Sequence, residues 1–135
     1  MKICIDCDPG VDDSLAILFA LARPDVEVVG ISTSVGNVTA KQGADNALRV
    51  LKLAGMEHKI PVCVGAEQPL NGDAVDFPEF IHGKNGIGNV ELPPSDQKTV
   101  DMDVCDFLYQ IASENEGELV LVTLGRMTNI AKTIK

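Results

Sequence analysis

Short apolar strands alternate with amphipathic helices along the whole of this chain. Runs rich in β-branched and other apolar residues predict strands at residues 2–7, 26–34, 60–64 and 119–124. Helical patterns occupy residues 12–22, 39–54 and 99–113, and a further helix begins near Thr128. This alternation predicts an α/β fold: an open, mostly parallel sheet with helices on both faces and right-handed crossovers. In such folds sites lie at the carboxyl ends of the strands.

Composition narrows the class of protein. A length of 135 residues with 45% hydrophobic residues fits one α/β domain over residues 1–135. The net charge of −9 argues against nucleic acid or an anionic membrane as a partner. No apolar run approaches the length of a membrane span, and Lys2 leads straight into a strand rather than a signal peptide. We therefore expect a cytoplasmic protein.

The four cysteines fit that compartment. Cys4 and Cys7 form a C-x-x-C inside the first predicted strand, where their side chains point to opposite faces. They are poorly placed for a disulfide or a shared metal ion, and no second pair completes a zinc site. We expect all four, including Cys63 and Cys105, to be reduced residues, mostly in the core.

An acidic passage joins the first strand to the first helix. Asp6 and Asp8 lie on one side of the strand, Pro9 and Gly10 turn the chain, and residues 12 and 13, both Asp, open the helix. A helix cap needs only one acid, and four carboxylates this close raise one another's pKa unless a cation neutralises them. An all-oxygen cluster suits Ca²⁺ or Mg²⁺. An EF-hand is excluded because the twelfth position counted from Asp6 is Ile17.

A long connection, residues 65–98, is rich in Pro, Gly, Asn and Asp and has little periodicity. Loops of this length in a compact domain are usually functional or disordered. Phe77, Phe80 and Ile81 suggest that part of it packs against the protein, and HGKNGIGN follows at residues 82–89. Neither a phosphate-binding P-loop nor a strand-linked G-x-G-x-x-G is present.

Four of these segments carry a family resemblance. DCDPGVDD (residues 6–13) resembles the signature of the inosine-uridine preferring nucleoside hydrolases. SVGN (34–37), HGKNGIGN (82–89) and TLGRMTNIA (123–131) are similar to further segments of that family, in the same order and with agreeing spacing. The resemblance implies a truncated, Rossmann-like nucleoside hydrolase core, with residues 1–135 as the amino-terminal portion of the family's fold.

The resemblance also implies roles for particular residues. Asp8 and Asp13 would bind Ca²⁺ with the backbone carbonyl of Thr128, and Asp8 would act as general base on a Ca²⁺-bound water. Ribose hydroxyls would be held by Asp12 and Asn37, while Asp6 orients the site from behind. His82 would lie near the base or the 5′-hydroxyl, unless it is an ordinary loop histidine. Asn129 is expected to be structural.

The implied reaction is Ca²⁺-dependent hydrolysis of the N-glycosidic bond of a ribonucleoside to ribose and free base. Its oxocarbenium-like transition state is one that nearby carboxylates stabilise. His82 weakly favours pyrimidine nucleosides as the expected substrates. Arg126 stands where the family usually has proline.

Members of this family are considerably longer than this chain. We therefore expect a fragment or one piece of a split protein, which forms a homo-oligomer or associates with a missing carboxyl-terminal half. Two alternatives stay open. The chain could be a truncated, non-catalytic relative that binds a metal or a partner, or a haloacid-dehalogenase-like phosphatase with Mg²⁺ and an aspartyl nucleophile. The DPGVDD continuation and the Asn37 segment fit the phosphatase poorly.

Overall fold

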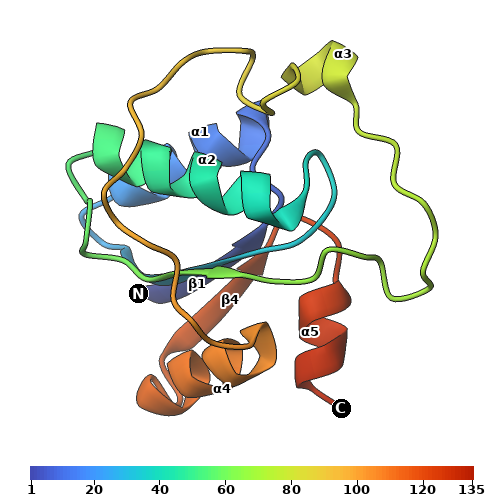
Figure 1. The fold of residues 1–135 in the computed structure, drawn as a ribbon. Helices are drawn as coiled ribbons and strands as arrows, with labels where there is room; N and C mark the ends of the chain where they lie inside the picture. The colour runs from blue at the N-terminus through green and yellow to red at the C-terminus, as the bar shows by residue number, and fades with distance from the viewer.

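One parallel sheet organises the fold, and the computed structural model describes all 135 residues (Figure 1). Its strands lie in the order β3-β2-β1-β4, and all three pairings are parallel. The strands are β1 (Lys2–Cys7), β2 (Glu27–Thr33), β3 (Val62–Val64) and β4 (Leu119–Thr123). The helices are α1 (Val11–Leu21), α2 (Ala40–Leu53), α3 (Glu79–His82), α4 (Val104–Glu114) and α5 (Thr128–Thr133). The predicted α/β architecture is confirmed.

Helices cover both faces of the sheet. Helices α1 and α2 pack on one face and α4 and α5 on the other, as Figure 1 shows. The first core includes Ile5, Ile17 and Leu51, and the second is built around Phe107. Each such buried apolar side chain contributes about 1.5–3 kcal/mol. Cys4 belongs to the second core and Cys7 to the first, which confirms that the C-x-x-C side chains point to opposite faces.

Helix starts follow the side chains that cap them. Thr39 Oγ1 accepts from the backbone N–H of Gln42 at 3.0 Å, as in the first half of a capping box, although the Gln42 side chain bonds Asn46 instead of returning to the cap. The prediction that the next long helix begins near residue 99 is wrong. Asp103 caps α4 by accepting from Cys105 N at 2.8 Å. Val100 N instead donates to Val62 O at 2.9 Å, so the chain runs beside β3 there.

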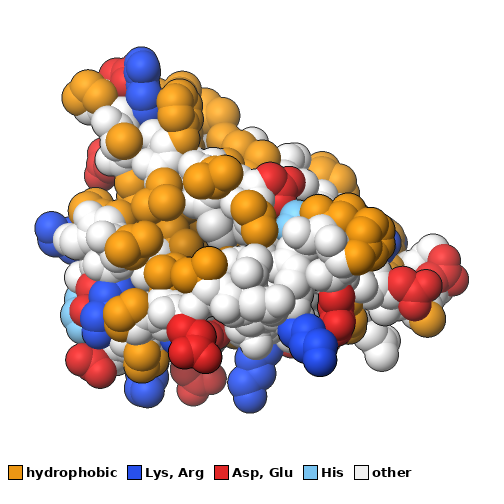
Figure 2. Space-filling model, turned by 90° about the horizontal axis from the view of Figure 1, so that it is seen from above, with side chains coloured by type: hydrophobic (Ala, Val, Ile, Leu, Met, Phe, Trp, Pro, Cys, Tyr) orange, Lys and Arg blue, Asp and Glu red, His pale blue; other side chains and the backbone are white.

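The long connection holds only the short helix α3. Its exposed residues contradict the expectation that the aromatic segment packs down: Phe80 is 91% exposed and Ile81 60%. His82 and Ile87 are buried in their place. Figure 2, which views the molecule from the side where α1 and α3 lie in Figure 1, shows apolar side chains spread over that surface.

Strand β4 forms one edge of the sheet. No strand pairs with its outer edge, and Val120 and Leu121 are 43% and 38% exposed. Beside it, an apolar groove of about 500 Å³ runs between β4 and α1. None of the helices combines the length and apolarity needed to cross a bilayer.

Candidate functional site

The carboxyl ends of β1, β2 and β4 meet around an acidic cleft. Each strand passes directly into a lining segment, because parallel strands end at the same edge of the sheet. The cleft has a volume of about 450 Å³. We call it the acidic cleft; its lining includes Asp8, Asp12, Asp13, Gly36, Asn37, Asp76, Gly125 and Arg126.

Two carboxylates are fixed at its base. Asp8 and Asp13 are 7% and 5% exposed, respectively. The backbone N–H of Asp8 donates to Asp13 Oδ2 at 2.9 Å, which ties the end of β1 to the first turn of α1. Asp8 Oδ2 accepts from the backbone N–H of Asn37 at 2.7 Å. The second bond joins the end of β1 to the turn after β2, so Asp8 is held through its backbone by Asp13 and through its carboxylate by Asn37.

Glycines make room beside Asp8. A Cβ on Gly36 would lie 1.9 Å from Asp8 Oδ2, and a Cβ on Gly125 would lie 2.7 Å from Asp8 Oδ1 and 3.2 Å from Ser34 Oγ. The hydroxyl of Ser34 and Asp6 Oδ2 are both buried without a hydrogen-bond partner. Such unpaired buried atoms are uncommon and point to a missing ligand or water.

Electrostatics favour a cation in this cleft. No lysine, arginine or histidine lies within ion-pair distance of Asp6, Asp8 or Asp13. Burial raises the pKa of Asp8, and burial followed by the charge of Asp8 raises the pKa of Asp13 to about 7. The candidate ligand atoms are all oxygens. No three acidic, histidine or cysteine side chains are close enough together to hold a metal ion by themselves. Two carboxylates completed by hydroxyl, carbonyl or substrate oxygens fit a hard divalent cation.

Behind the cleft, Asp6 and Asn129 form a fully buried pair. Asp6 Oδ1 accepts from Asn129 Nδ2 at 2.7 Å and from Ser32 Oγ at 2.5 Å. Asn129 also donates to Thr33 O at 2.9 Å and accepts from Ala66 N at 2.9 Å. Burial raises the pKa of Asp6 although both of its donors oppose that shift. Asn129 was expected to be structural. Its hydrogen bonds to Asp6, Thr33 and Ala66 join α5 to the sheet directly beneath the cleft.

His82 is anchored by the start of α1. Its Nδ1 accepts from the backbone N–H of Val11 at 3.1 Å and lies 3.8 Å from Asp12 Oδ1. Because Nδ1 accepts this bond, the proton of the neutral ring is on Nε2. Gly10 permits the contact, since a Cβ there would lie 2.6 Å from His82 Nδ1. His82 therefore takes the place of the missing side-chain cap of α1.

The structure brings most, but not all, of the predicted site residues together. Asp8, Asp12, Asp13 and Asn37 line one cleft. Thr128 is buried at the start of α5 and lines a neighbouring pocket with Met127. Arg126 lines both spaces and is exposed, so its positive charge stands at the rim of the acidic cleft.

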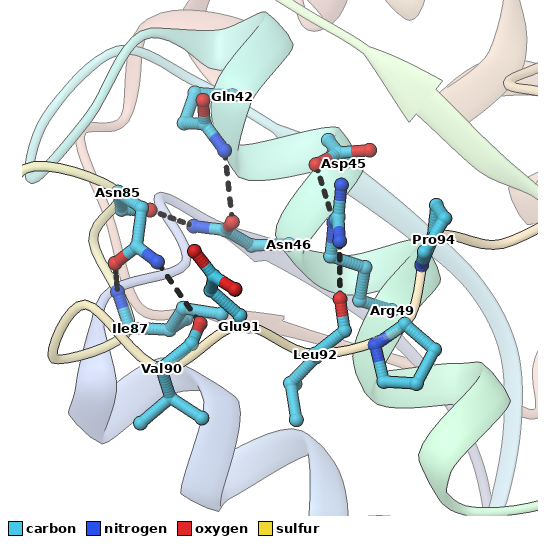
Figure 3. A pocket seen from close by; sticks show the side chains of 11 residues that line it. Gln42, Asp45, Asn46, Arg49, Asn85, Ile87, Val90, Glu91, Leu92 and Pro94 are labelled. Atoms are coloured by element: carbon cyan, nitrogen blue, oxygen red, sulfur yellow. Dashed lines mark hydrogen bonds and ion pairs between the residues drawn. The ribbon is translucent and has the colours of Figure 1, made fainter.

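A larger polar pocket of about 580 Å³ lies between α2 and residues 85–94 (Figure 3). Its charged residue Arg49 already bonds Asp45 Oδ2 at 2.7 Å and also donates to Leu92 O. No buried side chain in this pocket lacks a partner, whereas the acidic cleft has unpaired buried oxygens beside it. We therefore take the acidic cleft as the site. Sequence patterns missed Asn46, a lone amide among the buried residues of α2.

Comparisons with known proteins agree with this geometry. The profile of the family described as inosine-uridine preferring nucleoside hydrolase matches residues 3–135. The chain is 41% identical to uridine nucleosidase 1 of Arabidopsis thaliana over 134 residues, which cover 99% of this chain and 40% of that protein. It is 37% identical to the inosine-uridine preferring nucleoside hydrolase of Leishmania major, covering 99% and 43% of the two chains.

A solved structure gives the same result. The purine-preferring ribonucleoside hydrolase from Gardnerella vaginalis superimposes with a TM-score of 0.93 at 39% identity, covering 99% of this chain and 43% of that chain. The chain thus spans about two-fifths of the length of the relatives that it matches. The four motifs, the sheet order around the acidic cleft and the profile match over nearly every residue establish that the chain belongs to the inosine-uridine preferring nucleoside hydrolase family.

Proposed function

We propose that this protein forms the acidic wall of a Ca²⁺-dependent ribonucleoside hydrolase, which converts a ribonucleoside to ribose and free base. The observation that carries the proposal is the pair Asp8 and Asp13. Both carboxylates are buried, hydrogen-bonded through the Asp8 backbone and without a positively charged partner. In a chain of this family, such a pair fits the binding of a hard cation and a ribose diol.

The cation would be held by Asp8 and Asp13, with the backbone carbonyl of Thr128 as a further ligand. When bound, Ca²⁺ lowers the pKa of a coordinated water and orients water and ribose. The nearby Ser34 hydroxyl and the space left by Gly125 support a ligand at this position. Asp6 would keep Asp8 in place from behind, through its bonds to Ser32 and Asn129.

Residues of this chain would accept the proton from the attacking water and hold the ribose in place. Asp8 would accept the proton of the attacking water, whose oxygen bonds to the anomeric carbon while the C–N electron pair leaves with the base. Asp12 and Asn37 line the cleft and would hold the ribose hydroxyls. Since His82 Nδ1 is engaged by Val11, only its Nε2–H is free to donate to the base or the 5′-hydroxyl.

Partners and location follow as proposals. The relatives' names specify uridine in one case and purine preference in another, so base preference is left open between pyrimidines, which His82 favours, and purines. We propose a cytoplasmic setting because all four cysteines are free and burial raises the pKa of Cys4 and Cys63. The exposed edge of β4 supports association with a second copy or with a carboxyl-terminal portion.

One alternative retains an observation in its favour. A non-catalytic relative that binds a metal would use the same two buried carboxylates, Asp8 and Asp13, because holding a cation requires no turnover. The phosphatase alternative fits less well. It needs the first Asp of the D-x-D to attack phosphate, but Asp6 has no exposed surface and is bonded to Ser32 and Asn129.

The test is ribose release from inosine, uridine and cytidine, followed with a reducing-sugar assay with and without chelator. We expect release that chelator abolishes and that Asp8→Ala reduces at least about 10³-fold, because the proton acceptor and a cation ligand are both lost. Asp106→Asn, an exposed acid on α4, is the control and should keep full activity. Full activity of Asp8→Ala would contradict the assignment. Ca²⁺ binding by calorimetry without turnover would favour the non-catalytic relative, and phosphate release from a phosphomonoester would favour the phosphatase.

A further inference from the structure

One buried amide bonds two segments of the site that are far apart in sequence. Asn46 lies in α2 and is 1% exposed. Its Nδ2 donates to Pro9 O at 3.0 Å and to Asn85 O at 2.8 Å. Pro9 follows Asp8 directly, and Asn85 belongs to the loop that begins at His82. Figure 3 shows Asn46 between Asn85 and Gln42.

Every hydrogen-bonding group of this amide is used. Gln42 Nε2 donates to Asn46 Oδ1 at 3.0 Å, so the acceptor is used as well as the two Nδ2 protons that face the carbonyls. Asparagine suits the position because it offers two donors and an acceptor on one planar group. An aspartate of the same shape has the acceptor but no amide donors, and an apolar residue has neither. The loop that contains Asn85 is also stabilised by bonds within itself: Asn85 Oδ1 accepts from Ile87 N at 3.0 Å and from Asn89 N at 2.9 Å.

The glycine-rich loop closes directly over this contact. Gly86 has φ +84°, and a Cβ there would lie 3.0 Å from Asn46 Nδ2 and 3.3 Å from Pro9 O. It would also lie 2.6 Å from Val38 Cγ1. The glycine is therefore required both by its backbone conformation and by the close approach. Close packing over Asn46, and not a phosphate cradle, accounts for glycine at this point of HGKNGIGN.

The same loop holds the acidic turn at a second point. His82 Nδ1 accepts from Val11 N at 3.1 Å, so the turn between Asp8 and Asp13 is held at Pro9 by Asn46 and at Val11 by His82. Moving Pro9 would displace Asp8 relative to Asp13, because Asp8 N donates to Asp13 Oδ2 across the same turn.

We propose that Asn46 is a positioning residue: through Pro9 it sets the separation of the Asp8 and Asp13 carboxylates, and through Asn85 it couples that separation to the loop that carries His82. The role in catalysis rests on the proposed function, whereas the coupling between the two segments does not. Asn46 touches neither cation nor substrate in this scheme.

The test compares Asn46→Asp and Asn46→Ala with Gln42→Ala, which removes the bond to Asn46 Oδ1 and leaves both donations to Pro9 and Asn85. Ca²⁺ affinity is measured by calorimetry well below the unfolding temperature. We expect the Asn46 variants to bind Ca²⁺ at least about tenfold more weakly and Gln42→Ala within about twofold of wild type. In any form that turns over nucleoside, kcat should fall along with the loss of Ca²⁺ affinity. Wild-type Ca²⁺ affinity in the folded Asn46→Asp protein would overturn the proposal.

Amide hydrogen exchange of the metal-free protein separates this proposal from the proposed function. Asn46→Asp should accelerate exchange in both residues 10–14 and residues 82–89, whereas Gln42→Ala should change neither. If wild type does not bind Ca²⁺, the proposed function fails and exchange still decides the coupling. If Asn46→Asp does not fold, Gly86→Ala replaces it in this experiment, because a Cβ at Gly86 disturbs the same contact from the loop side. Exchange unchanged in one of the two segments would refute the coupling.

Discussion

At the scale of single residues, the acidic cleft holds buried carboxylates that have no positive group within ion-pair distance, since Arg126 stands at its rim. Asp13 shows the consequence most clearly, since burial and the neighbouring Asp8 charge raise its pKa to about 7. Asp8 and Asp6 shift in the same direction. In the metal-free protein these carboxyls therefore hold protons that free carboxyls would release, and the cleft is stabilised by protonation or by a cation.

The pH dependence of stability tests this point. Burial and the Asp8 charge raise the pKa of Asp13 from near 4 in the unfolded chain to about 7 in the folded protein, so between these pH values the folded state binds more protons. The free energy of unfolding should therefore fall as pH rises from about 4 to about 7, with a slope approaching one proton per molecule. Denaturant unfolding in chelator measures it. Asp13→Asn should flatten the slope and Asp106→Asn should keep it; an equal slope in Asp13→Asn would contradict the assignment.

Gly36 offers a second residue-scale prediction. A Cβ at this position would lie 1.9 Å from Asp8 Oδ2 and 2.6 Å from its Cγ. Gly36→Ala should therefore displace the Asp8 carboxylate from Asn37 N, lower stability by more than about 1 kcal/mol and lower Ca²⁺ affinity at least about tenfold. Val35→Ala shortens the neighbouring buried side chain and is the control, which should lose stability but keep Ca²⁺ affinity. Calorimetry on both variants distinguishes the two effects.

At the scale of elements, side chains from later in the chain fix how the strand ends meet. Asn129, at the start of α5, contacts β1 through Asp6, β2 through Thr33 O and the segment after β3 through Ala66 N. It therefore fixes α5, and with it Thr128, relative to two strands and the segment that follows a third.

Removal of this amide should be costly. Asn129→Ala leaves a buried carboxyl oxygen, a carbonyl and an N–H short of partners, which we expect to lower the free energy of unfolding by about 2–4 kcal/mol. Gln110→Ala removes an exposed amide bond to Glu114 on α4 and should cost less than about 0.5 kcal/mol. Thermal or denaturant unfolding of both variants gives the comparison. Equal losses would show that Asn129 does not connect these elements.

The elements themselves could be predicted from sequence, and their long-range contacts could not. Periodicity and strand composition located all four strands, and the position of Asp8 and Asn37 directly after two of them predicted a shared edge. The start of α4 was misplaced because Asp103 caps it, a local choice among several possible caps. The contact of His82 with Val11 spans 71 residues and those of Asn46 span 37 and 39, and no local pattern encodes such pairs.

At the scale of the whole molecule, the sheet is well covered at its centre and exposed along β4. Val120 on this strand is 43% exposed, and Leu124, the residue just after it, is 42% exposed and lines an apolar groove with Met1 and Phe19. The outer edge of β4 offers unpaired backbone groups. An exposed apolar edge strand is a template for pairing with another chain, so we expect the 135-residue polypeptide produced by itself to self-associate.

Val120→Lys should suppress this association, because a charged side chain on an edge strand opposes burial of that edge. We expect the dissociation constant for self-association, measured by analytical ultracentrifugation, to rise at least about tenfold, or about 1.4 kcal/mol. Val90→Lys is the matched control: Val90 is 54% exposed, lies in the connection before α4, and its replacement changes the net charge equally. If both variants weaken association alike, net charge and not the β4 edge governs it. If neither does, the contact surface lies elsewhere, and the exposed apolar side chains near α1 and α3 become the next surface to test (Figure 2).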